Sequence, residues 1–457
     1  MKWEEFSRWF NRDFWRAFKN HTFPIKIPQT AAEKKAKVRE VFESVQSARY
    51  AASIPEAEIV LNKGYGVART VPIFCIEDYI VYYFCIKELE GVISGNRTEN
   101  TFGGWTLGGK LRKQEDLDVQ FDIDFSSARY SFNPRAWIYA FGEFNSLLFS
   151  QLETGTYTHV LQFDLSNFYD CVRLDILERW IREDAPSDKG WIITLLFYFL
   201  NQWNRRNTGL HSQGVGIPQD ALADCSRLLA NYYLQRYDKF AADICLQVNA
   251  TYFRYADDQM VLLNGTERTE ELMLLLTRTL DRYGLRVNQK KVTLWRAEDL
   301  EQHRCRDIQA IFTKNDDKKN PKLVRKFVDA YLKLSARQIA ATWNGGLPLL
   351  NRLLWANLES LPQKLFNKIL TRYTRESYLL QADQGRLIRV HELNQKRKRP
   401  VNLRKRLIDL GRVRVHNSFH HECLSFACAT KDRRMVHFFS KRLKEIEEQM
   451  ESKRISS

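Results

Sequence analysis

The sequence lacks long apolar runs, cysteine pairs and an N-terminal targeting signal. In its 457 residues no stretch of about 20 uncharged apolar residues occurs, so no membrane-spanning helix is expected. Glu4 and Glu5 stand where a signal peptide needs an apolar segment, which predicts a cytoplasmic protein. None of the 8 cysteines forms a C-x-x-C pair, so buried free thiols are expected rather than a disulfide framework.

Two ligand-binding motifs are also missing. The glycine-rich stretch FGGWTLGGK, which ends at Lys110, does not match the phosphate-binding pattern G-x-x-x-x-G-K-[ST], and we expect a flexible hairpin there. The C-terminal histidines and cysteines fit no common zinc spacing, so a helix with core cysteines is expected instead. This group comprises His416, His420, His421, Cys423 and Cys428.

Positive charge is what the sequence has in excess. It contains 71 Lys and Arg against 55 Asp and Glu, a net charge of +16, and residues 386–457 alone hold 19 against 8. This asymmetry predicts a polyanionic partner, with nucleic acid the first candidate and an acidic membrane the second. The residues predicted to bind phosphates form two runs: Lys396, Arg397, Lys398 and Arg399, then Arg404, Lys405 and Arg406.

Both ends of the chain show helical periodicity. Trp3, Phe6, Phe10 and Phe14 recur at helical spacing, which predicts a helix docked on the body of the protein. A helix for a partner protein or a membrane surface is the alternative. In residues 320–457 apolar residues recur every three or four positions, which predicts a series of short helices.

Acidic residues in the middle of the chain stand at the ends of apolar segments. Asp164 ends the run HVLQFD, as expected of a buried strand that delivers one carboxylate. Asp257 and Asp258 occupy a tight turn between two apolar half-strands, which predicts a hairpin. Adjacent carboxylates repel each other unless a cation lies between them, and Mg²⁺ prefers carboxylate and phosphate oxygens. We therefore expect these acids to converge on two Mg²⁺ ions that activate a 3′-hydroxyl and stabilise the leaving pyrophosphate.

The order of four short segments makes this hypothesis specific. They are Asp164 with Phe168 and Tyr169, then Gly216-Ile-Pro-Gln219, then Tyr255-Ala-Asp-Asp258, then Gly284-Leu285 through Asn288 to Lys291. In this order the segments resemble the palm motifs of reverse transcriptases, and residues 69–84 resemble the fingers motif of bacterial members. The resemblance covers approximately residues 65–295.

The resemblance implies roles for the matching residues. Tyr169, next to Phe168, matches the bulky residue beneath the sugar of the incoming dNTP, where a ring collides with a 2′-hydroxyl. The implied catalytic acids and ligands of two Mg²⁺ ions, which Mn²⁺ can replace, are Asp164, Asp257 and Asp258, with Leu165 as a further ligand. The other implied nucleotide-binding residues are Pro218, Gln219, Lys291 and Arg69.

Three of these assignments have a plain structural alternative. Core packing is the less favoured alternative for Tyr169, and a solvated lysine at a helix end is the alternative for Lys291. For Arg69 the alternative is a structural role after a glycine-rich turn.

One residue departs from the family pattern. Asp220 follows Gln219 where the second motif of reverse transcriptases continues with glycine, which places a carboxylate near the expected template and predicts unusual template handling. With a basic helical region after the palm, the layout is similar to that of bacterial abortive-infection and defence-associated reverse transcriptases. That branch implies antiphage defence and DNA synthesis on an RNA template or a companion non-coding RNA, or synthesis that is protein-primed or untemplated.

Other functions stay open at this point. A retron or group II intron reverse transcriptase is one alternative, although intron-type endonuclease cysteine pairs are absent from the C-terminal region. An RNA-dependent RNA polymerase is disfavoured by Tyr169 and by the Tyr255-Ala-Asp-Asp form. A catalytically inactive RNA-binding protein on a palm scaffold is disfavoured by the intact acids. A homo-oligomer or a partner protein is compatible with the helical tail, and a membrane is not an expected partner.

The predicted fold class is α+β, a right-hand polymerase core of fingers and palm followed by an all-helical region. We expect an N-terminal helix and fingers in residues 1–155, the palm in 156–313, and a basic helical thumb and C-terminal module in 314–457.

Overall fold

The structure is a computed structural model that divides into two compact units. It describes residues 1–11, 14–15, 18, 25–62, 67–94, 97–103, 111–113, 121–123, 136–204, 216–219 and 224–455. One unit comprises Met1–Glu58 and Thr70–Ala297, and the other Ile59–Arg69 and Glu298–Ser457. The second unit thus starts before residue 314, and the boundary expected at residues 155/156 is not a boundary between units. The three-part division stays a prediction.

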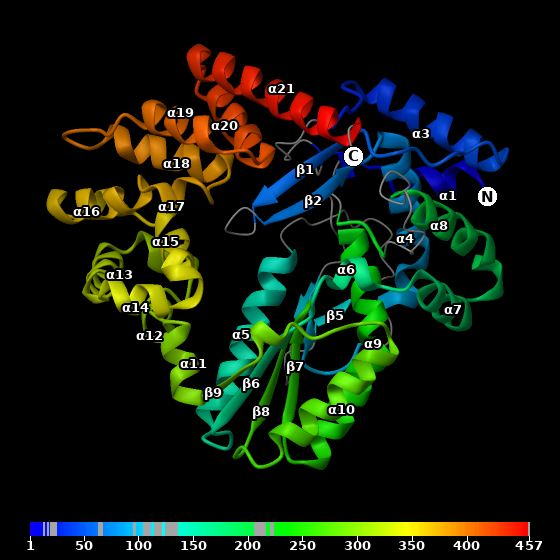
Figure 1. The fold of residues 1–457 in the computed structure, drawn as a ribbon, viewed down its shortest axis with the longest axis horizontal. Helices are drawn as coiled ribbons and strands as arrows, with labels where there is room; N and C mark the ends of the chain where they lie inside the picture. Colours follow the sequence, from blue (N-terminus) through cyan, green and yellow to red (C-terminus); the bar gives the residue numbers. More distant parts are fainter. Residues whose placement is uncertain are drawn as a thin grey trace. The chain divides into compact units, whose positions relative to one another are not determined.

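A five-stranded sheet forms the centre of the first unit (Figure 1). Its strand order is β3-β7-β8-β6-β9, with bounds β3 Thr101–Phe102, β6 His159–Asp164, β7 Thr251–Tyr255, β8 Asp258–Leu263 and β9 Thr293–Arg296. β6 pairs antiparallel with β8 and with β9, β7 pairs antiparallel with β8, and β3 adds a short parallel edge. The sheet is therefore mixed, and its middle strands carry the predicted acids at their ends.

The apolar content of β6 explains why it lies inside the sheet. Val160, Leu161 and Phe163 are all buried, so the strand packs on both faces. Gln162 is half-buried and accepts a hydrogen bond from Trp295 Nε1 of the edge strand β9 at 3.0 Å. The apolar run predicted to end in Asp164 is confirmed as a buried strand.

Helices cover both faces of the sheet at β7. Alternate side chains of a strand point to opposite faces. Tyr252 contacts Tyr237 of α9 (Asp224–Gln247), whereas Phe253 contacts Phe144 of α5 (Ala136–Glu153). α9 also packs against α10 (Thr269–Arg282), which follows the β7–β8 hairpin.

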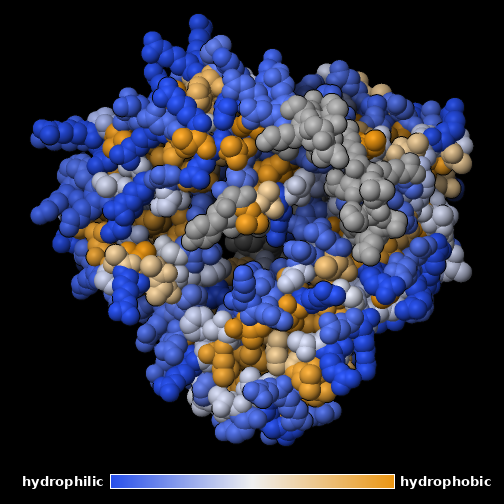
Figure 2. Space-filling model, viewed as in Figure 1, coloured by the Kyte–Doolittle hydropathy of each residue, from blue (hydrophilic) through white to orange (hydrophobic). Residues whose placement is uncertain are grey.

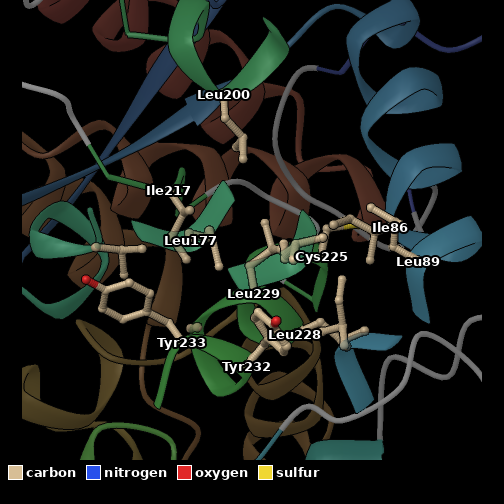
Figure 3. Packing of buried hydrophobic residues seen from close by; sticks show 14 of the residues in the cluster. Ile86, Leu89, Leu177, Leu200, Ile217, Cys225, Leu228, Leu229, Tyr232 and Tyr233 are labelled. Carbon is tan, nitrogen blue, oxygen red and sulfur yellow. The ribbon is translucent and has the colours of Figure 1, made fainter. Parts of the chain in front are cut away.

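Other helices of the first unit build its main apolar core around α9 (Figure 3). They are α4 Ile76–Ser94, α6 Phe168–Cys171, α7 Leu174–Asp184 and α8 Gly190–Gln202. Ile86 of α4, Leu177 of α7 and Leu200 of α8 converge on Leu228 and Leu229 of α9, and all five are buried. Burial of each such side chain contributes roughly 1.5–3 kcal/mol, so this core holds the helices firmly against one another.

The N-terminal aromatic residues dock on the same unit. Phe6 of α1 (Trp3–Ser7) is fully buried against Phe84 of α4 and Phe42 of α3 (Ala31–Gln46). Phe14 is also buried, against Tyr83 of α4. These contacts confirm the predicted docking of the N-terminal aromatic residues on the body of the protein.

Two small two-stranded sheets complete the strands of the described chain. β1 (Ala57–Asn62) and β2 (Ala68–Ile73) form a two-stranded sheet, and β4 (Leu111–Lys113) pairs antiparallel with β5 (Phe121–Ile123). Most of the predicted glycine-rich hairpin, including Lys110, lies outside the described residues.

The second unit is predominantly helical, as predicted for the C-terminal region. Its helices are α11 Ala297–His303, α12 Arg306–Gln309, α13 Pro321–Lys333, α14 Ala336–Ala341, α15 Leu347–Leu354, α16 Gln363–Tyr373, α17 Glu376–Leu379, α18 Gln384–Gln395, α19 Leu403–Val413, α20 Asn417–Ala429 and α21 Arg433–Ile455. They share a separate apolar core that includes stacked Phe312 and Phe327. The start of α13 is typical of a helix: Pro321 stands at its first position and the Asn320 side chain accepts from Lys322 N at 3.0 Å.

The α+β class is confirmed by this mixture of a central sheet and a helical C-terminal region. None of the described helices combines the length and apolar character needed to cross a membrane.

Candidate active site

The predicted acids meet at the ends of paired strands. The β6–β8 register places Asp164 directly opposite Asp258, and Asp257 immediately precedes Asp258 in the β7–β8 turn. Directly opposed residues in an antiparallel pair have their Cβ atoms about 4.5–5.5 Å apart. Residues separated by more than 90 positions in the sequence thus place their carboxyl groups side by side.

The acids differ in their exposure to solvent. Asp164 is only 5% exposed, Asp257 is half-buried and Asp258 is exposed. Burial and the negative charges of Asp164 and Asp258 together raise the pKa of Asp257 to about 6. The site is therefore short of positive charge, which is the electrostatic setting that favours a bound cation.

Lys291 supplies one positive charge to this site. It lies in the 3-10 turn Gln289–Lys291, and its ammonium donates to Asp164 Oδ2 at 2.6 Å. The main chain fixes the same segment, because Asn288 N donates to Asp164 O at 2.7 Å. Partial burial alone would lower the pKa of Lys291, but the contact with Asp164 raises it, so the ammonium stays charged. The structure thus brings Lys291 to the acids, and its predicted role at a triphosphate stays a prediction.

The predicted glycine-proline turn lies against the segment after Asp164. Ile217 N donates to Tyr169 O at 3.0 Å, and Trp203 Nε1 donates to Gly216 O at 3.2 Å. Gly216 has φ +60°, and a Cβ there would lie 2.0 Å from Tyr169 O. Only glycine fits this position, which explains why the second motif begins with it.

Tyr169 lies on the short helix that follows Asp164 in the chain, and the predicted Pro218 turn packs against this segment. Tyr169 is half-buried on α6, with its ring edge-on to buried Phe168 at 5.6 Å between centroids. Pro218 is buried and Gln219 half-buried. Leu165 is buried as well, and its main chain bridges to Val287. Asp220, the predicted departure from the family pattern, lies outside the described residues.

The donor set fits a divalent cation in chemistry, although it is not a closed metal cage. Carboxylate oxygens are what Mg²⁺ prefers, and this ion usually takes one or two protein carboxylates, with water and phosphate completing its shell. Within the described part of the chain, no three His, Cys, Asp or Glu side chains are grouped closely enough to hold a metal ion by themselves. The fit rests on the crowded acids and on the ammonium at Asp164, which shows that a cation is accommodated there.

Not every predicted residue is brought to these acids. Arg69 is exposed on β2 and belongs to the second unit, so its role at the nucleotide stays a prediction. The C-terminal histidines and cysteines lie on or next to α20, with Cys423 buried and Cys428 exposed, and His420 Nε2 is bonded to Arg414 O at 3.0 Å. The expected helix is confirmed, and Cys423 belongs to its core, but the expectation of a core position for Cys428 is wrong because that residue is exposed.

The basic runs lie at the ends of helices in the second unit. Lys396 pairs with Glu359 at 2.6 Å and Arg404 with Asp432 at 2.5 Å. Arg397 donates to Thr371 Oγ1 at 3.2 Å, and Arg406 donates to Thr374 O at the end of α16. The side chains of Lys398, Arg399 and Lys405 are exposed and make no ion pair or hydrogen bond with other described residues.

A buried polar group behind the turn was not predicted. Arg254 donates hydrogen bonds to Asp238, to Asn231 and to the carbonyl of Ala256. The sequence holds a signal for this group. Arg254 is a charged residue inside an apolar strand, and Asn231 and Asp238 stand two turns apart on one face of the preceding helix.

Comparisons with known proteins identify the domain that carries these acids. Residues 130–322 match the family model described as reverse transcriptase (RNA-dependent DNA polymerase). No curated protein matches this chain. A solved structure of telomerase from Candida albicans, in complex with the TWJ fragment of telomeric RNA, aligns with 10% identity and a TM-score of 0.36, over 89% of this chain and 70% of that chain.

The family match covers all four predicted palm motifs. The sheet that holds them is a reverse transcriptase palm, and the protein is an enzyme of the RNA-directed DNA polymerase class, a nucleotidyltransferase. Enzymes of this class generally use divalent metal ions.

The close approach at Gly216 is open to a direct test. We expect Gly216→Ala to lower the free energy of unfolding by at least about 2 kcal/mol, because the new methyl group meets Tyr169 O at a left-handed backbone position. Gly91→Ala is the matched control, because it lies within α4 and a methyl group there would have no atom within 4 Å, and we expect a gain of about 0.5–1 kcal/mol. Urea denaturation measures both, and equal stability of the two variants would contradict the contact.

The raised pKa of Asp257 predicts how stability changes with pH. Since its folded-state pKa of about 6 exceeds the ordinary 3.8, the folded protein binds this proton more tightly than the unfolded chain does. Asp257 therefore costs stability above pH 6, and the cost disappears as the pH falls toward 4. We expect Asp257→Asn to be more stable than wild type at pH 8 by on the order of 2 kcal/mol, with a smaller difference at pH 5. Thermal unfolding at several pH values measures this, and a difference independent of pH would refute it.

Proposed function

We propose that this protein is a DNA polymerase that adds dNTPs to a 3′-hydroxyl by two-metal catalysis at Asp164, Asp257 and Asp258. The observation that supports this most directly is the β6–β8 register, which sets Asp164 opposite Asp258 inside the domain that matches reverse transcriptases. The reaction class, RNA-directed DNA synthesis, follows from the matching domain. We propose in addition the metal mechanism, the roles of the residues, the template and the biological setting.

The metal ligands in this proposal are the carboxylates of Asp164 and Asp257, with Asp258 as the supporting acid and Leu165 as a further ligand. Bound Mg²⁺ ions, or Mn²⁺ in their place, supply a lowered pKa for the attacking hydroxyl and charge stabilisation for the leaving pyrophosphate. The protein contributes by holding the acids on paired strands before the substrate arrives. Its site is negative and partly buried, so electrostatic interactions there are less screened than at the open surface.

Lys291 keeps a positive charge beside the acids in this scheme. Its side chain is 60% exposed, whereas that of Asp164 is only 8% exposed, so the ammonium can move into solvent without breaking the core. In that position we propose that it contacts the triphosphate of the incoming nucleotide. Gln219 and Pro218 are proposed to contact the nucleotide and the template.

Tyr169 is the proposed selector of deoxynucleotides. Its ring is fixed by Phe168 on one side, and its main-chain carbonyl is fixed by Ile217 N. We propose that this ring lies beneath the sugar of the incoming nucleotide, where it collides with a 2′-hydroxyl. The same contacts are also expected of a residue that only packs in the core. Whether Tyr169→Ala accepts ribonucleotides distinguishes sugar selection from core packing.

The proposed setting is antiphage defence, on an RNA template or a companion non-coding RNA, or with a protein primer or no template. Support comes from Asp220 in the second motif and from the basic helical region that follows the palm. Strongly hydrophilic side chains, with hydrophobic patches between them, lie on the part of the surface where Figure 1 draws α16, α18 and α19 (Figure 2). We propose that this region binds the phosphate backbone of a nucleic acid.

Nucleotide incorporation by the purified full chain tests the polymerase proposal. The protein is incubated with each dNTP and Mg²⁺, with and without the RNA that copurifies with it, and the products are sequenced. We expect labelled DNA from wild type, no detectable product from Asp257→Ala or Asp164→Asn, and added incorporation of ribonucleotides by Tyr169→Ala. Asp243→Ala, an exposed acid on α9, is the matched control and is expected to keep wild-type activity.

The outcomes separate the competing functions. Incorporation by Asp257→Ala equal to that of wild type would reject catalysis by these acids. RNA binding that is strongly salt-dependent, without any incorporation by wild type, would favour a catalytically inactive RNA-binding protein. Product DNA copied from a structured RNA encoded beside the gene would favour a retron-type enzyme.

The basic surface makes a separate prediction. Replacing Lys398, Arg399 and Lys405 together by Gln should weaken nucleic-acid binding, because these three cations are free to release counterions from phosphates. The slope of log K against log salt should fall by about 2–3. Lys396→Gln/Arg404→Gln is the matched control, since both cations are already paired with acids, and it should change the slope less. Filter binding over a salt series decides, and equal slopes for all three proteins would exclude this surface.

A further inference from the structure

A fully buried arginine lies behind the catalytic turn. Arg254, on β7, is 0% exposed, and like Tyr252 it points to the sheet face that α9 covers. Phe253 and Tyr255 point to the other face, where Phe144 of α5 packs on both. A charged side chain at such a position is rare, because burial of an unpaired charge is strongly unfavourable.

Asp238 of α9 neutralises this arginine. Arg254 Nε donates to Asp238 Oδ1 at 2.7 Å and Nη2 donates to Oδ2 at 2.5 Å, a two-pronged pair in which both side chains are fully buried. Tyr252 also donates to Asp238 Oδ1, at 3.0 Å. Burial by itself would lower the pKa of Arg254, but the Asp238 carboxylate more than offsets this and raises it, so the guanidinium stays charged.

The third nitrogen of the guanidinium reaches the turn. Nη1 of Arg254 donates to Ala256 O at 2.8 Å and to Asn231 Oδ1 at 2.8 Å. A lysine has no planar fork and cannot hold a carboxylate with two nitrogens while a third reaches elsewhere. The side chain thus ties α9 to the main chain of the residue immediately before Asp257.

Ala256 is held on both sides of its backbone. Its carbonyl accepts from Arg254, and its N–H donates to Phe102 O of β3 at 3.1 Å. Its φ is +53°, in the left-handed region that a non-glycine residue occupies only when its surroundings enforce it. Two hydrogen bonds from outside the turn provide that enforcement.

Gly103 closes the network on the side of β3. It has φ +133°, and a Cβ at this position would lie 2.9 Å from Asn231 Nδ2 and 3.5 Å from Ala256 N. The absence of a side chain lets the end of β3 approach both the turn and Asn231. Three elements therefore converge on Ala256: β3, which is distant in the sequence, and the consecutive elements α9 and β7.

We propose that Arg254, held by Asp238 and Asn231, is a positioning residue that fixes the Ala256 peptide and thereby aims the Asp257 carboxylate at the catalytic metal. The inference rests on the proposed function for the role of Asp257. The anchoring of the turn itself is a property of the protein without metal, which lets the two be tested separately.

The test removes both buried charges at once. In Arg254→Met/Asp238→Leu no buried charge is left unpaired, so the variant should remain folded with a melting temperature near that of wild type. Two measurements that need no turnover report on the turn: Mn²⁺ affinity by electron paramagnetic resonance, and hydrogen exchange of the peptide that spans Tyr255–Gln259. We expect Mn²⁺ to bind about tenfold more weakly or worse, and the Ala256 amide to exchange faster.

A second buried pair in the same unit provides the matched control. Lys87 and Glu90 on α4 form an ion pair with side chains 6% and 7% exposed. Lys87→Met/Glu90→Leu should leave Mn²⁺ affinity and exchange at the turn as in wild type. Unchanged Mn²⁺ affinity together with unchanged exchange in Arg254→Met/Asp238→Leu would overturn the proposal.

A milder substitution keeps the proposal testable if the double variant unfolds. Arg254→Lys retains the charge opposite Asp238 but not the fork, so it should remain folded, release the Ala256 carbonyl and show the same faster exchange. Wild-type exchange in this variant would count against the proposal. If wild type and Asp257→Ala bind Mn²⁺ equally, the metal role in the proposed function fails, while hydrogen exchange still decides whether Arg254 anchors the turn.

Discussion

Repulsion among three carboxylates is the constraint around which the palm is organised. The β6–β8 pairing cannot form without setting Asp164 opposite Asp258, and the turn then adds Asp257 beside them. Nothing in the strand itself offsets this cost, so the surrounding structure must. It does so through a large apolar core on both faces of the sheet and through one ammonium at Asp164. The residual repulsion appears as the raised pKa of Asp257, and it is the property that makes the site receptive to divalent cations.

Unusual backbone conformations cluster around the same acids. Asn167, Gly216 and Ala256 all have positive φ, and each lies next to a motif residue. Such conformations persist only where the surroundings determine them. At Gly216 a side chain would collide with Tyr169 O, which is why glycine stands there, and Ala256 is hydrogen-bonded through both its N–H and its carbonyl. The strain of a positive φ is thus confined to the non-glycine residues, and contacts with other elements fix the turn at Ala256.

The sequence predicted the parts of this site that depend on local pattern. The apolar run before Asp164 predicted β6, and the acids at the ends of apolar segments predicted where the carboxylates meet. Their role as metal ligands stays a prediction. The N-terminal helix was predicted to dock, and Phe6 confirms it. What local pattern does not contain is the partner of a side chain. Arg254 pairs with Asp238 on another element, and Lys291 donates to Asp164. The expected role of Lys291 at a triphosphate stays a prediction. The unit boundary near residue 298 likewise depends on packing between distant segments.

Lys291 and Arg254 both carry a positive charge near the acids, but they differ in burial and therefore in how freely they can move. Lys291 has a largely exposed side chain, so water can replace Asp164 as its partner at small cost, and its charge is available to move during a reaction cycle. Arg254 is fully buried, so loss of Asp238 would leave a charge with no solvent to stabilise it. A mobile charge suits contact with substrates that come and go, whereas a fixed charge suits holding a peptide in one orientation. In the proposed mechanism the palm uses both, because the acids must keep their geometry while the metal ions and nucleotides around them change.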